Sequence, residues 1–117
     1  MNDAHHARHL ILLPTYNERE NISDLLDALC ALDEPVDVLV IDDSSPDGTS
    51  EEVMHHSAFA TRVFLLLRRK KEGLGSAYRS GFAWGLERAY ATFIQMDADF
   101  SHRPDDVPRL LDAIQNG

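Results

Sequence analysis

The chain has 117 residues, of which 44% are hydrophobic, enough for one compact domain with a buried core but not for two. Its 20 Asp and Glu residues outnumber its 11 Lys and Arg residues, and the resulting net charge of -9 argues against nucleic acid as a partner. The single cysteine, Cys30, has no cysteine with which to form an internal disulfide, and this favours a reducing, cytoplasmic location.

Four short apolar runs predict buried parallel strands. They cover residues 10–13, 36–41, 63–67 and 92–96, and Pro14 is expected to close the first of them. Helical periodicity between and after these runs predicts four helices. They cover residues 22–32, 49–57, 76–89 and a stretch that begins at Pro104. Asn17 with Glu20, and Thr49 with Glu52, are the expected capping pairs of the first two helices.

The alternation of strands and helices predicts an α/β fold, in which helices cover both faces of a parallel sheet. Ligands of such sheets bind at the carboxyl ends of the strands. Polar residues follow each of the four predicted strands, so the sequence places a candidate site along that edge.

The first strand leads into Pro14, Tyr16, Asn17 and Glu18, which place an aromatic face and a carboxylate beside a helix start. A nucleoside could lie there. The alternative interpretation is structural, with Asn17 capping the helix and Tyr16 packing against its neighbours.

The second strand ends in Asp42 and Asp43, and a turn over residues 46–49 follows. Turn chemistry explains the composition of that turn but not the two acids before it. Carboxylates directly after a buried strand are costly unless they are paired, solvated or bound to a ligand. Ribose hydroxyls or the edge of a base are natural partners for such a group.

The third strand leads into the densest positive charge of the chain, residues 68–71, followed by Gly73 and Gly75. One interpretation is a solvated basic loop. The other is a phosphate contact by Arg69, Lys71 and the bare backbone at the two glycines. The following helix also carries small residues every four positions, which predicts close packing against a neighbour. They are Ala77, Gly81, Gly85 and Ala89.

The fourth strand is followed by Asp97 and Asp99, which point to the same side at strand periodicity. Two carboxylates about 5 Å apart repel by roughly 3 kcal/mol at an effective dielectric constant near 20, so the pair favours a cation. Oxygen ligands of this kind suit Mg²⁺ or Mn²⁺. The alternative is a solvated acidic turn that caps the last helix.

Four segments together, LPTYNE, VIDDSSPDGT, GLGSAYRSGF and QMDADFSHRP, resemble the N-terminal half of the family 2 inverting glycosyltransferases, specifically the polyprenyl (dolichyl) phosphate mannosyltransferases. The resemblance extends from residue 10 to the end of the chain. It implies a GT-A (Rossmann-like) nucleotide-diphospho-sugar transferase fold, truncated after the fourth βα unit. Residues 1–8 would form a loose tail, and residues 9–117 the part that binds the nucleotide sugar.

The resemblance also implies roles for individual residues. The nucleotide sugar would contact Pro14, Tyr16, Glu18, Asp42, Asp43, Asp97, Ala98 and Asp99. Asp97 and Asp99 would be the catalytic residues and the ligands of Mg²⁺ or Mn²⁺. Some family members place a further metal ligand, a glutamine, where Ser101 stands, and serine has a shorter reach.

The implied reaction transfers mannose from GDP-mannose to a polyprenyl phosphate with inversion at the sugar. The lipid acceptor implies peripheral contact at the cytoplasmic face of a membrane. Family catalytic domains continue beyond the helix after the acidic pair, so a separate C-terminal half is one expectation. Self-association through an exposed sheet edge is another.

Three alternatives remain open at this point. A related transferase could use another nucleotide sugar, such as UDP-glucose, with the same acidic pair. A module that binds a nucleotide sugar without catalysis fits equally well, because every feature concerns the donor. A receiver-type signalling domain fits less well, since its acidic pair follows the first strand, whereas here the adjacent acids follow the second.

Overall fold

The structure is a computed structural model that describes residues 9–33, 35–69, 72–98, 104 and 106–109. Several sequence-based predictions lie outside these residues. They are the tail over residues 1–8, the phosphate contact of Lys71, the metal ligands Asp99 and Ser101, and most of the last helix.

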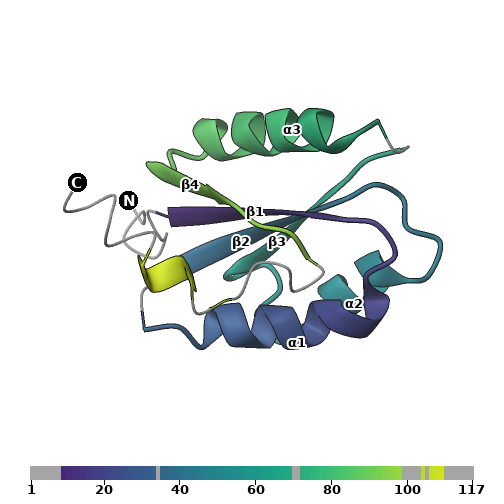
Figure 1. The fold of residues 1–117 in the computed structure, drawn as a ribbon, viewed down its shortest axis with the longest axis horizontal. Helices are drawn as coiled ribbons and strands as arrows, with labels where there is room; N and C mark the ends of the chain where they lie inside the picture. Colours follow the sequence, from purple (N-terminus) through teal and green to yellow (C-terminus); the bar gives the residue numbers. More distant parts are fainter. Residues whose placement is uncertain (1–8, 34, 70–71, 99–103, 105, 110–117) are drawn as a thin grey trace.

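In the described part of the chain, four parallel strands form one sheet with the order β3-β2-β1-β4. They are β1 (His9–Thr15), β2 (Val36–Asp42), β3 (Val63–Leu67) and β4 (Thr92–Gln95). The chain runs outward from β1 to β3 and then returns across the sheet to β4 on the other side of β1 (Figure 1). The strand order therefore reverses at β1, and ligands of open α/β sheets bind at such a reversal.

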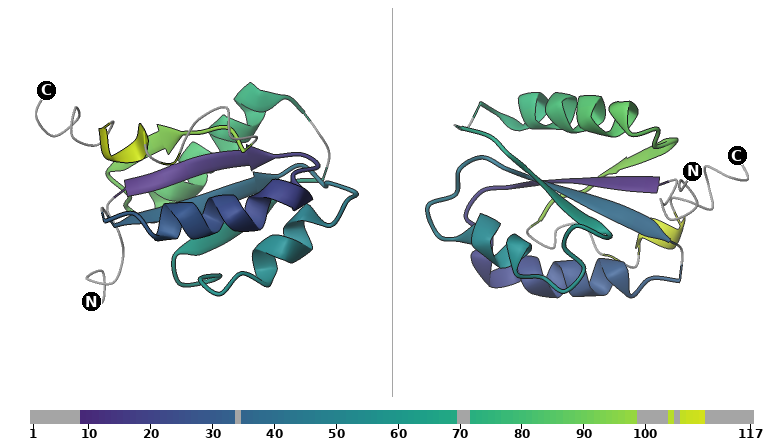
Figure 2. Two further views of the ribbon diagram at one scale, coloured as in Figure 1. Left: turned by 60° about the horizontal axis from the view of Figure 1, so that its bottom comes forward. Right: turned by 180° about the vertical axis from the view of Figure 1, so that it is seen from behind.

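Helices cover both faces of the sheet, as the sequence predicts. Figures 1 and 2 show α1 (Arg19–Cys30) and α2 (Thr49–Met54) on one face and α3 (Leu74–Glu87) on the other. Residues 106–109 are helical as well. Within the described part of the chain, no helix is long and apolar enough to cross a membrane.

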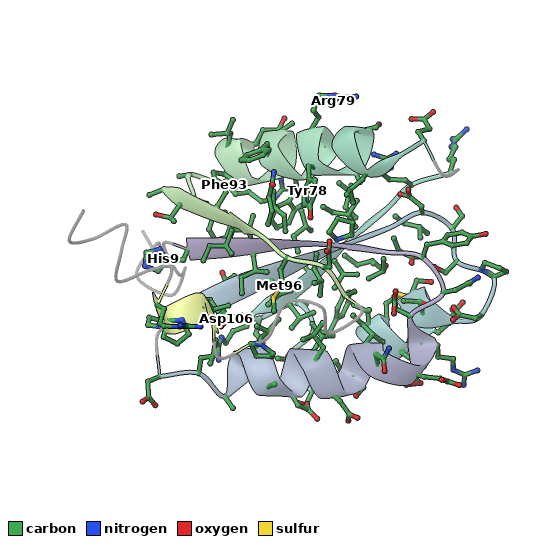
Figure 3. The ribbon with its side chains drawn as sticks, in the orientation of Figure 1. His9, Tyr78, Arg79, Phe93, Met96 and Asp106 are labelled. Carbon is green, nitrogen blue, oxygen red and sulfur yellow. The ribbon has the colours of Figure 1, made fainter. Side chains whose placement is uncertain are left out.

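The strands are apolar along their length because both of their faces are buried. In β1, Ile11 and Leu13 pack toward α1, while Leu10 and Leu12 pack toward α3, and none of the four is exposed. Figure 3 shows Phe93 and Tyr78 between α3 and the sheet, Met96 on the α1 side, and Arg79 on the outer surface of α3.

The glycines of α3 allow this helix to lie close to the sheet, as the small-residue stripe predicts. A Cβ atom on Gly85 would lie 2.4 Å from Cε2 of Phe93, and one on Gly81 would lie 2.7 Å from Cδ1 of Ile41. Real Cβ atoms essentially never come this close to a neighbour. Packing against the sheet therefore offsets the helix propensity that glycine forfeits.

We expect Gly85→Ala to lower the free energy of unfolding by about 1–2 kcal/mol, because overpacking costs about 1–3 kcal/mol and alanine regains at most about 1 kcal/mol of helix propensity. Urea denaturation followed by circular dichroism measures the change. Gly75→Ala is the matched control in the same helix, since its Cβ would meet only Nη1 of Arg79 at 3.4 Å. A Gly85 variant as stable as the Gly75 variant would contradict the packing argument.

Both capping predictions are wrong. Glu18 precedes α1, and neither Asn17 nor Glu20 caps it with a side chain. Thr49 is the first residue of α2 rather than its cap, and Gly48 precedes it with φ 91°. The start of α1 is instead capped by a different loop, which also lines the candidate site.

Several predicted ends also shift. The first strand does not stop at Pro14 but continues to Thr15. Pro14 is tolerated because β4 pairs with β1 only as far as Leu12, so among the described residues Pro14 has a strand neighbour, β2, on one side only. The helix α2 ends at Met54 instead of near residue 57, and α3 begins two residues earlier than predicted.

Candidate functional site

A cavity of about 140 Å³ opens at the carboxyl edge of the sheet. We call it the edge cavity, and its lining residues are Pro14, Thr15, Tyr16, Asp43, Gly73, Leu74 and Ala77. They come from the end of β1, the end of β2 and the start of α3, three segments that are distant in sequence. The structure thus brings together Pro14, Tyr16, Asp43 and Gly73, four of the predicted site residues.

The chemistry of the edge cavity is mixed. Tyr16 and Leu74 are exposed at 39% and 55%, so an aromatic ring and an apolar side chain are accessible to a ligand in the edge cavity. Asp43 supplies a carboxylate that is almost fully buried. Apolar walls with a few well-placed polar groups are typical of sites for a flat organic ligand, whose faces stack while its edge is hydrogen-bonded.

Asp42 has a different environment from Asp43. Its side chain is completely buried and accepts hydrogen bonds from Oγ1 of Thr15 at 2.7 Å, and from the backbone N and Oγ of Ser45 at 3.0 Å and 2.6 Å. Asp42 therefore fastens the end of β1 to the turn after β2. Of the two adjacent acids, Asp43 is the one that lines the edge cavity.

Asp43 is paired with an arginine that the sequence reasoning did not single out. Nε of Arg68 lies 2.9 Å from Oδ1 of Asp43, and both side chains are 9% exposed. Arg68 directly follows β3, and in the sequence it is the first residue of the basic run over residues 68–71, which by itself predicts solvated side chains. Its position as the first residue after a buried strand was the signal that could have separated it from that run.

The loop between β2 and α2 caps the start of α1. Its side chains accept hydrogen bonds from three successive backbone amides, Asn17 N to Ser45 Oγ (2.9 Å), Glu18 N to Thr49 Oγ1 (3.0 Å) and Arg19 N to Asp47 Oδ2 (3.2 Å). Desolvation tends to raise the pKa of Asp47, but hydrogen bonds from Thr49 and from the Arg19 backbone outweigh it and hold this pKa below its ordinary value. The positive end of α1 is thus already occupied by a carboxylate.

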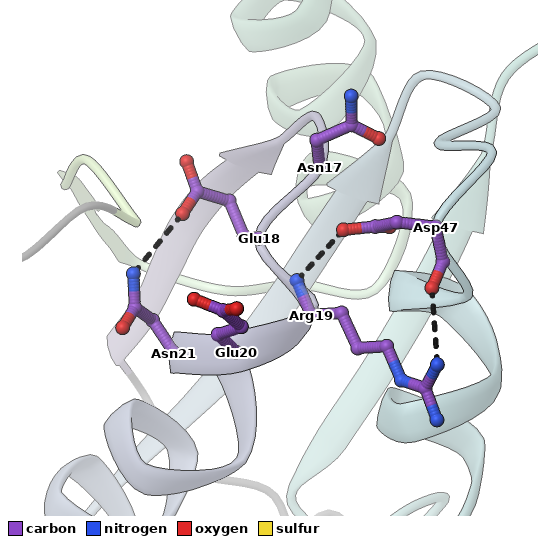
Figure 4. A pocket seen from close by; sticks show the side chains of 6 residues that line it. All are labelled: Asn17, Glu18, Arg19, Glu20, Asn21 and Asp47. Atoms are coloured by element: carbon purple, nitrogen blue, oxygen red, sulfur yellow. Dashed lines mark hydrogen bonds between the residues drawn. The ribbon is translucent and has the colours of Figure 1, made fainter.

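Glu18 faces a different hollow from Pro14 and Tyr16. This hollow of about 420 Å³, which we call the α1 depression, is lined by Asn17, Glu18, Arg19, Glu20, Asn21 and Asp47. Figure 4 shows these six side chains. The Glu18 carboxylate accepts a hydrogen bond from Nδ2 of Asn21 at 3.5 Å. The predicted contact of Glu18 with a nucleoside therefore lies beside the edge cavity, outside its lining.

Asp97 lies at the same edge of the sheet. The backbone N of Met96 donates to Leu12 O at 3.1 Å, which carries the β1–β4 pairing to the residue before Asp97. The Asp97 side chain is half-buried. Burial, and next the charge of Asp97, raise the pKa of Tyr78 on α3, so Asp97 lies within electrostatic reach of the helix above it.

Ala98, the other predicted donor contact in this segment, is buried in the core on the α1 side. Among the described residues, no cluster of three or more His, Cys, Asp or Glu side chains could hold a metal ion. Of the predicted acidic pair, the structure describes Asp97, while Asp99 lies outside the described residues.

The phosphate candidates are divided between two places. Gly73 lines the edge cavity and precedes α3 with φ 95°, and the first turn of α3 carries neither an acidic residue nor a side-chain cap. Arg69 instead lines a hollow of about 290 Å³, which we call the Arg68 depression, together with Arg68, Glu72 and Ser80. Gly75 is exposed in the first turn of α3.

Comparison with known sequences gives a consistent result. Residues 10–117 match the family described as glycosyl transferase family 2. An undecaprenyl-phosphate mannosyltransferase of Micrococcus luteus is 47% identical over 108 residues, which cover 92% of this chain and 44% of that relative. A polyprenol monophosphomannose synthase of Mycolicibacterium smegmatis is 46% identical over 112 residues, or 94% of this chain and 42% of the relative. The chain thus spans less than half the length of these relatives.

Solved structures with a similar fold include the mannosyltransferase PcManGT from Pyrobaculum calidifontis in complex with GDP-Man and Mn²⁺. It has a TM-score of 0.66 and 27% identity, over 79% of this chain and 27% of that one. Glucosyl-3-phosphoglycerate synthase from Mycobacterium tuberculosis, in complex with Mn²⁺ and UDP, has a TM-score of 0.67 and 22% identity, over 98% of this chain and 42% of that one. The predicted α/β transferase fold is therefore confirmed.

Proposed function

We propose that this chain, which belongs to glycosyl transferase family 2, is the donor-binding part of an enzyme that transfers mannose from GDP-mannose to a polyprenyl phosphate. The observation that carries the proposal is the gathering of Pro14, Tyr16, Asp43 and Gly73 around one cavity at the strand-order reversal. The identity of 47% and 46% to two relatives named for transfer to such lipids supports the same substrates.

The edge cavity suits the nucleoside part of the donor. Pro14 and the Tyr16 ring would contact the faces of the base or ribose, and the Asp43 carboxylate would accept hydrogen bonds from their N–H or O–H groups. The start of α3 beside Gly73 would face the diphosphate, because free backbone N–H groups at a helix start attract anions.

A divalent cation fits the acidic residues at the end of β4. Carboxylate oxygens are the ligands that Mg²⁺ and Mn²⁺ prefer, and the half-buried Asp97 supplies them at the edge where the donor would lie. Asp97 and Asp99 would hold the metal, with Ser101 as a further candidate. When bound, the metal would neutralise the charge that develops on the departing GDP.

The acceptor phosphate does not require a general base from the protein. A lipid phosphate is already anionic, so the enzyme must position it rather than deprotonate it. We assign no general base and no acceptor-binding residue to the described part of this chain. A membrane lipid as acceptor, together with the single free cysteine Cys30, favours an enzyme at the cytoplasmic face of a membrane.

A module that binds a nucleotide sugar without transferring it is the second candidate. The observation in its favour is that every described feature of the edge concerns the donor. Such a module would bind GDP-mannose and metal as the enzyme does, so transfer of mannose to a polyprenyl phosphate separates the two candidates.

We expect calorimetric titration of the purified protein to show binding of GDP-mannose that strengthens when Mn²⁺ is added. GDP and UDP-glucose are the comparators, and GDP-mannose should bind more tightly than UDP-glucose. A folded protein that binds no nucleotide sugar would overturn the proposal. Tighter binding of UDP-glucose than of GDP-mannose would show that the donor is not GDP-mannose.

A further inference from the structure

We infer that Arg68 is a positioning residue of the edge cavity, which holds the Asp43 carboxylate in place and ties it to α3. The inference rests on the proposed function, since it assigns a role in donor binding to a residue outside the cavity lining. It deepens that function by naming what orients Asp43, the one carboxylate among the described residues that line the edge cavity.

The side chain of Arg68 spans the space between two strand ends and a helix. Its Nε pairs with Oδ1 of Asp43 at 2.9 Å, and its Nη2 lies 3.8 Å from Oε1 of Glu72. Its Nη1 donates to Oγ of Ser80 on α3 at 3.4 Å. One guanidinium group therefore connects the end of β2, the segment before α3, and α3 itself.

The backbone of Arg68 is fastened to the same place. Its N–H donates to the carbonyl oxygen of Asp42 at 2.8 Å, and its carbonyl oxygen accepts a hydrogen bond from the Ser44 hydroxyl. These contacts hold Arg68 beside the turn that carries Asp43. The side chain is also 91% buried, so it does not behave as a mobile surface arginine.

Because the Arg68–Asp43 pair is buried, loss of either charge should affect the other residue and, through Asp43, the binding of a ligand. A buried carboxylate without a counter-charge is costly, and removal of one partner from a buried pair leaves the other charge uncompensated. The planar guanidinium fork can pair with a carboxylate while its other N–H groups bind elsewhere, which a lysine ammonium does less well. Loss of Arg68 would thus remove the counter-charge beside the Asp43 carboxylate and weaken the hold on its orientation toward the edge cavity.

Arg68 also separates two hollows. Asp43 lines the edge cavity on one side, and Arg68 lines the Arg68 depression on the other, together with Arg69, Glu72 and Ser80. A donor in the edge cavity would meet Asp43 without touching Arg68. The role of Arg68 is therefore to position Asp43 and the start of α3 rather than to contact the ligand.

The test compares the affinity for GDP-mannose with Mn²⁺ among Arg68→Met, Arg68→Lys, Asp43→Asn and the double variant Arg68→Met with Asp43→Asn. We expect Arg68→Met to weaken binding about tenfold, or about 1.4 kcal/mol, and Arg68→Lys to restore part of it. The double variant should bind about as well as Asp43→Asn alone, because Arg68 acts through Asp43.

Arg62→Met is the matched control for loss of a partly buried arginine. Arg62 donates to the carbonyl oxygens of Cys30 at 2.9 Å and Val36 at 2.7 Å, at the opposite end of β2. It should lower the melting temperature without changing the affinity for GDP-mannose. A merely structural role for Arg68 predicts the same result for both arginines.

The outcomes separate this inference from the proposed function. Absence of nucleotide-sugar binding by the unsubstituted protein overturns both. Binding by that protein with unchanged affinity in folded Arg68→Met overturns only the role of Arg68. If Arg68→Met does not fold, Arg68→Lys decides the question, because a folded lysine variant with unchanged affinity also overturns the inference.

Discussion

An Asp97→Asn variant is expected to lose the metal-dependent part of GDP-mannose binding, with a Kd in Mn²⁺ raised by about 100-fold. Substitutions that only support a metal ligand cost about 10–100-fold in metal affinity, so loss of a ligand should reach the upper end of that range. Asparagine keeps the size of the side chain and removes the charge. Calorimetry with and without Mn²⁺ measures the effect directly.

Two controls accompany the Asp97 variant. Asp24→Asn removes an exposed carboxylate from α1 and should leave the affinity unchanged. The charge of Asp97 also raises the pKa of Tyr78, after the larger effect of burial, so Asp97→Asn should lower this pKa toward its ordinary value. Ultraviolet titration, with Tyr78→Phe to assign the signal, detects that change without any donor. Full Mn²⁺-dependent binding by Asp97→Asn would contradict the proposed metal site.

A Tyr90→Phe variant is expected to lower the free energy of unfolding by about 1.5–3 kcal/mol, the range for a hydrogen bond to a charged group. The Tyr90 hydroxyl donates to Oδ2 of Asp37 at 2.6 Å, and both residues are buried between the sheet and α3. Burial, followed by this hydrogen bond, raises the pKa of Tyr90 far above its ordinary value, so the hydroxyl stays protonated and remains a donor. Phenylalanine would remove the hydroxyl that donates this hydrogen bond to the Asp37 carboxylate.

Urea denaturation followed by circular dichroism measures the loss. Tyr78→Phe is the matched control, because it removes the same atom from a half-buried tyrosine on the α3 side, whose hydroxyl has no hydrogen bond to a described residue. It should change the stability by less than about 0.5 kcal/mol. Equal losses in the two variants would show that the Tyr90–Asp37 hydrogen bond contributes nothing beyond the aromatic packing.

The strands were predictable because a strand buried on both faces must be apolar throughout, and such runs are visible in the sequence alone. The helix starts were not. The side chains that cap α1 lie 28 or 31 residues farther along the chain, so a local capping rule selected Asn17 and Glu20 instead. Asp37 was missed for the same reason, since its partner Tyr90 is 53 residues away.

Much of the candidate site also followed from the sequence. Parallel strands end at one edge, so the residues after β1 and β2 and those before α3 had to meet there, and Pro14, Tyr16, Asp43 and Gly73 do line one cavity. The same rule did not separate Glu18, which lies in the α1 depression because Asn17, with φ 58°, turns the chain between Tyr16 and α1.

The sequence by itself determined the layered fold and the edge at which the polar residues gather, because burial of both sheet faces leaves a periodic pattern in the chain. Only the tertiary structure decided that Asp42 fastens two loops while Asp43 lines the cavity, and that Arg68 is a buried partner rather than a solvated charge. Adjacent acids and adjacent basic residues look alike in sequence. Their roles diverge because turns with unusual backbone angles, such as the φ of 56° at Ser44, aim neighbouring side chains at partners from distant segments.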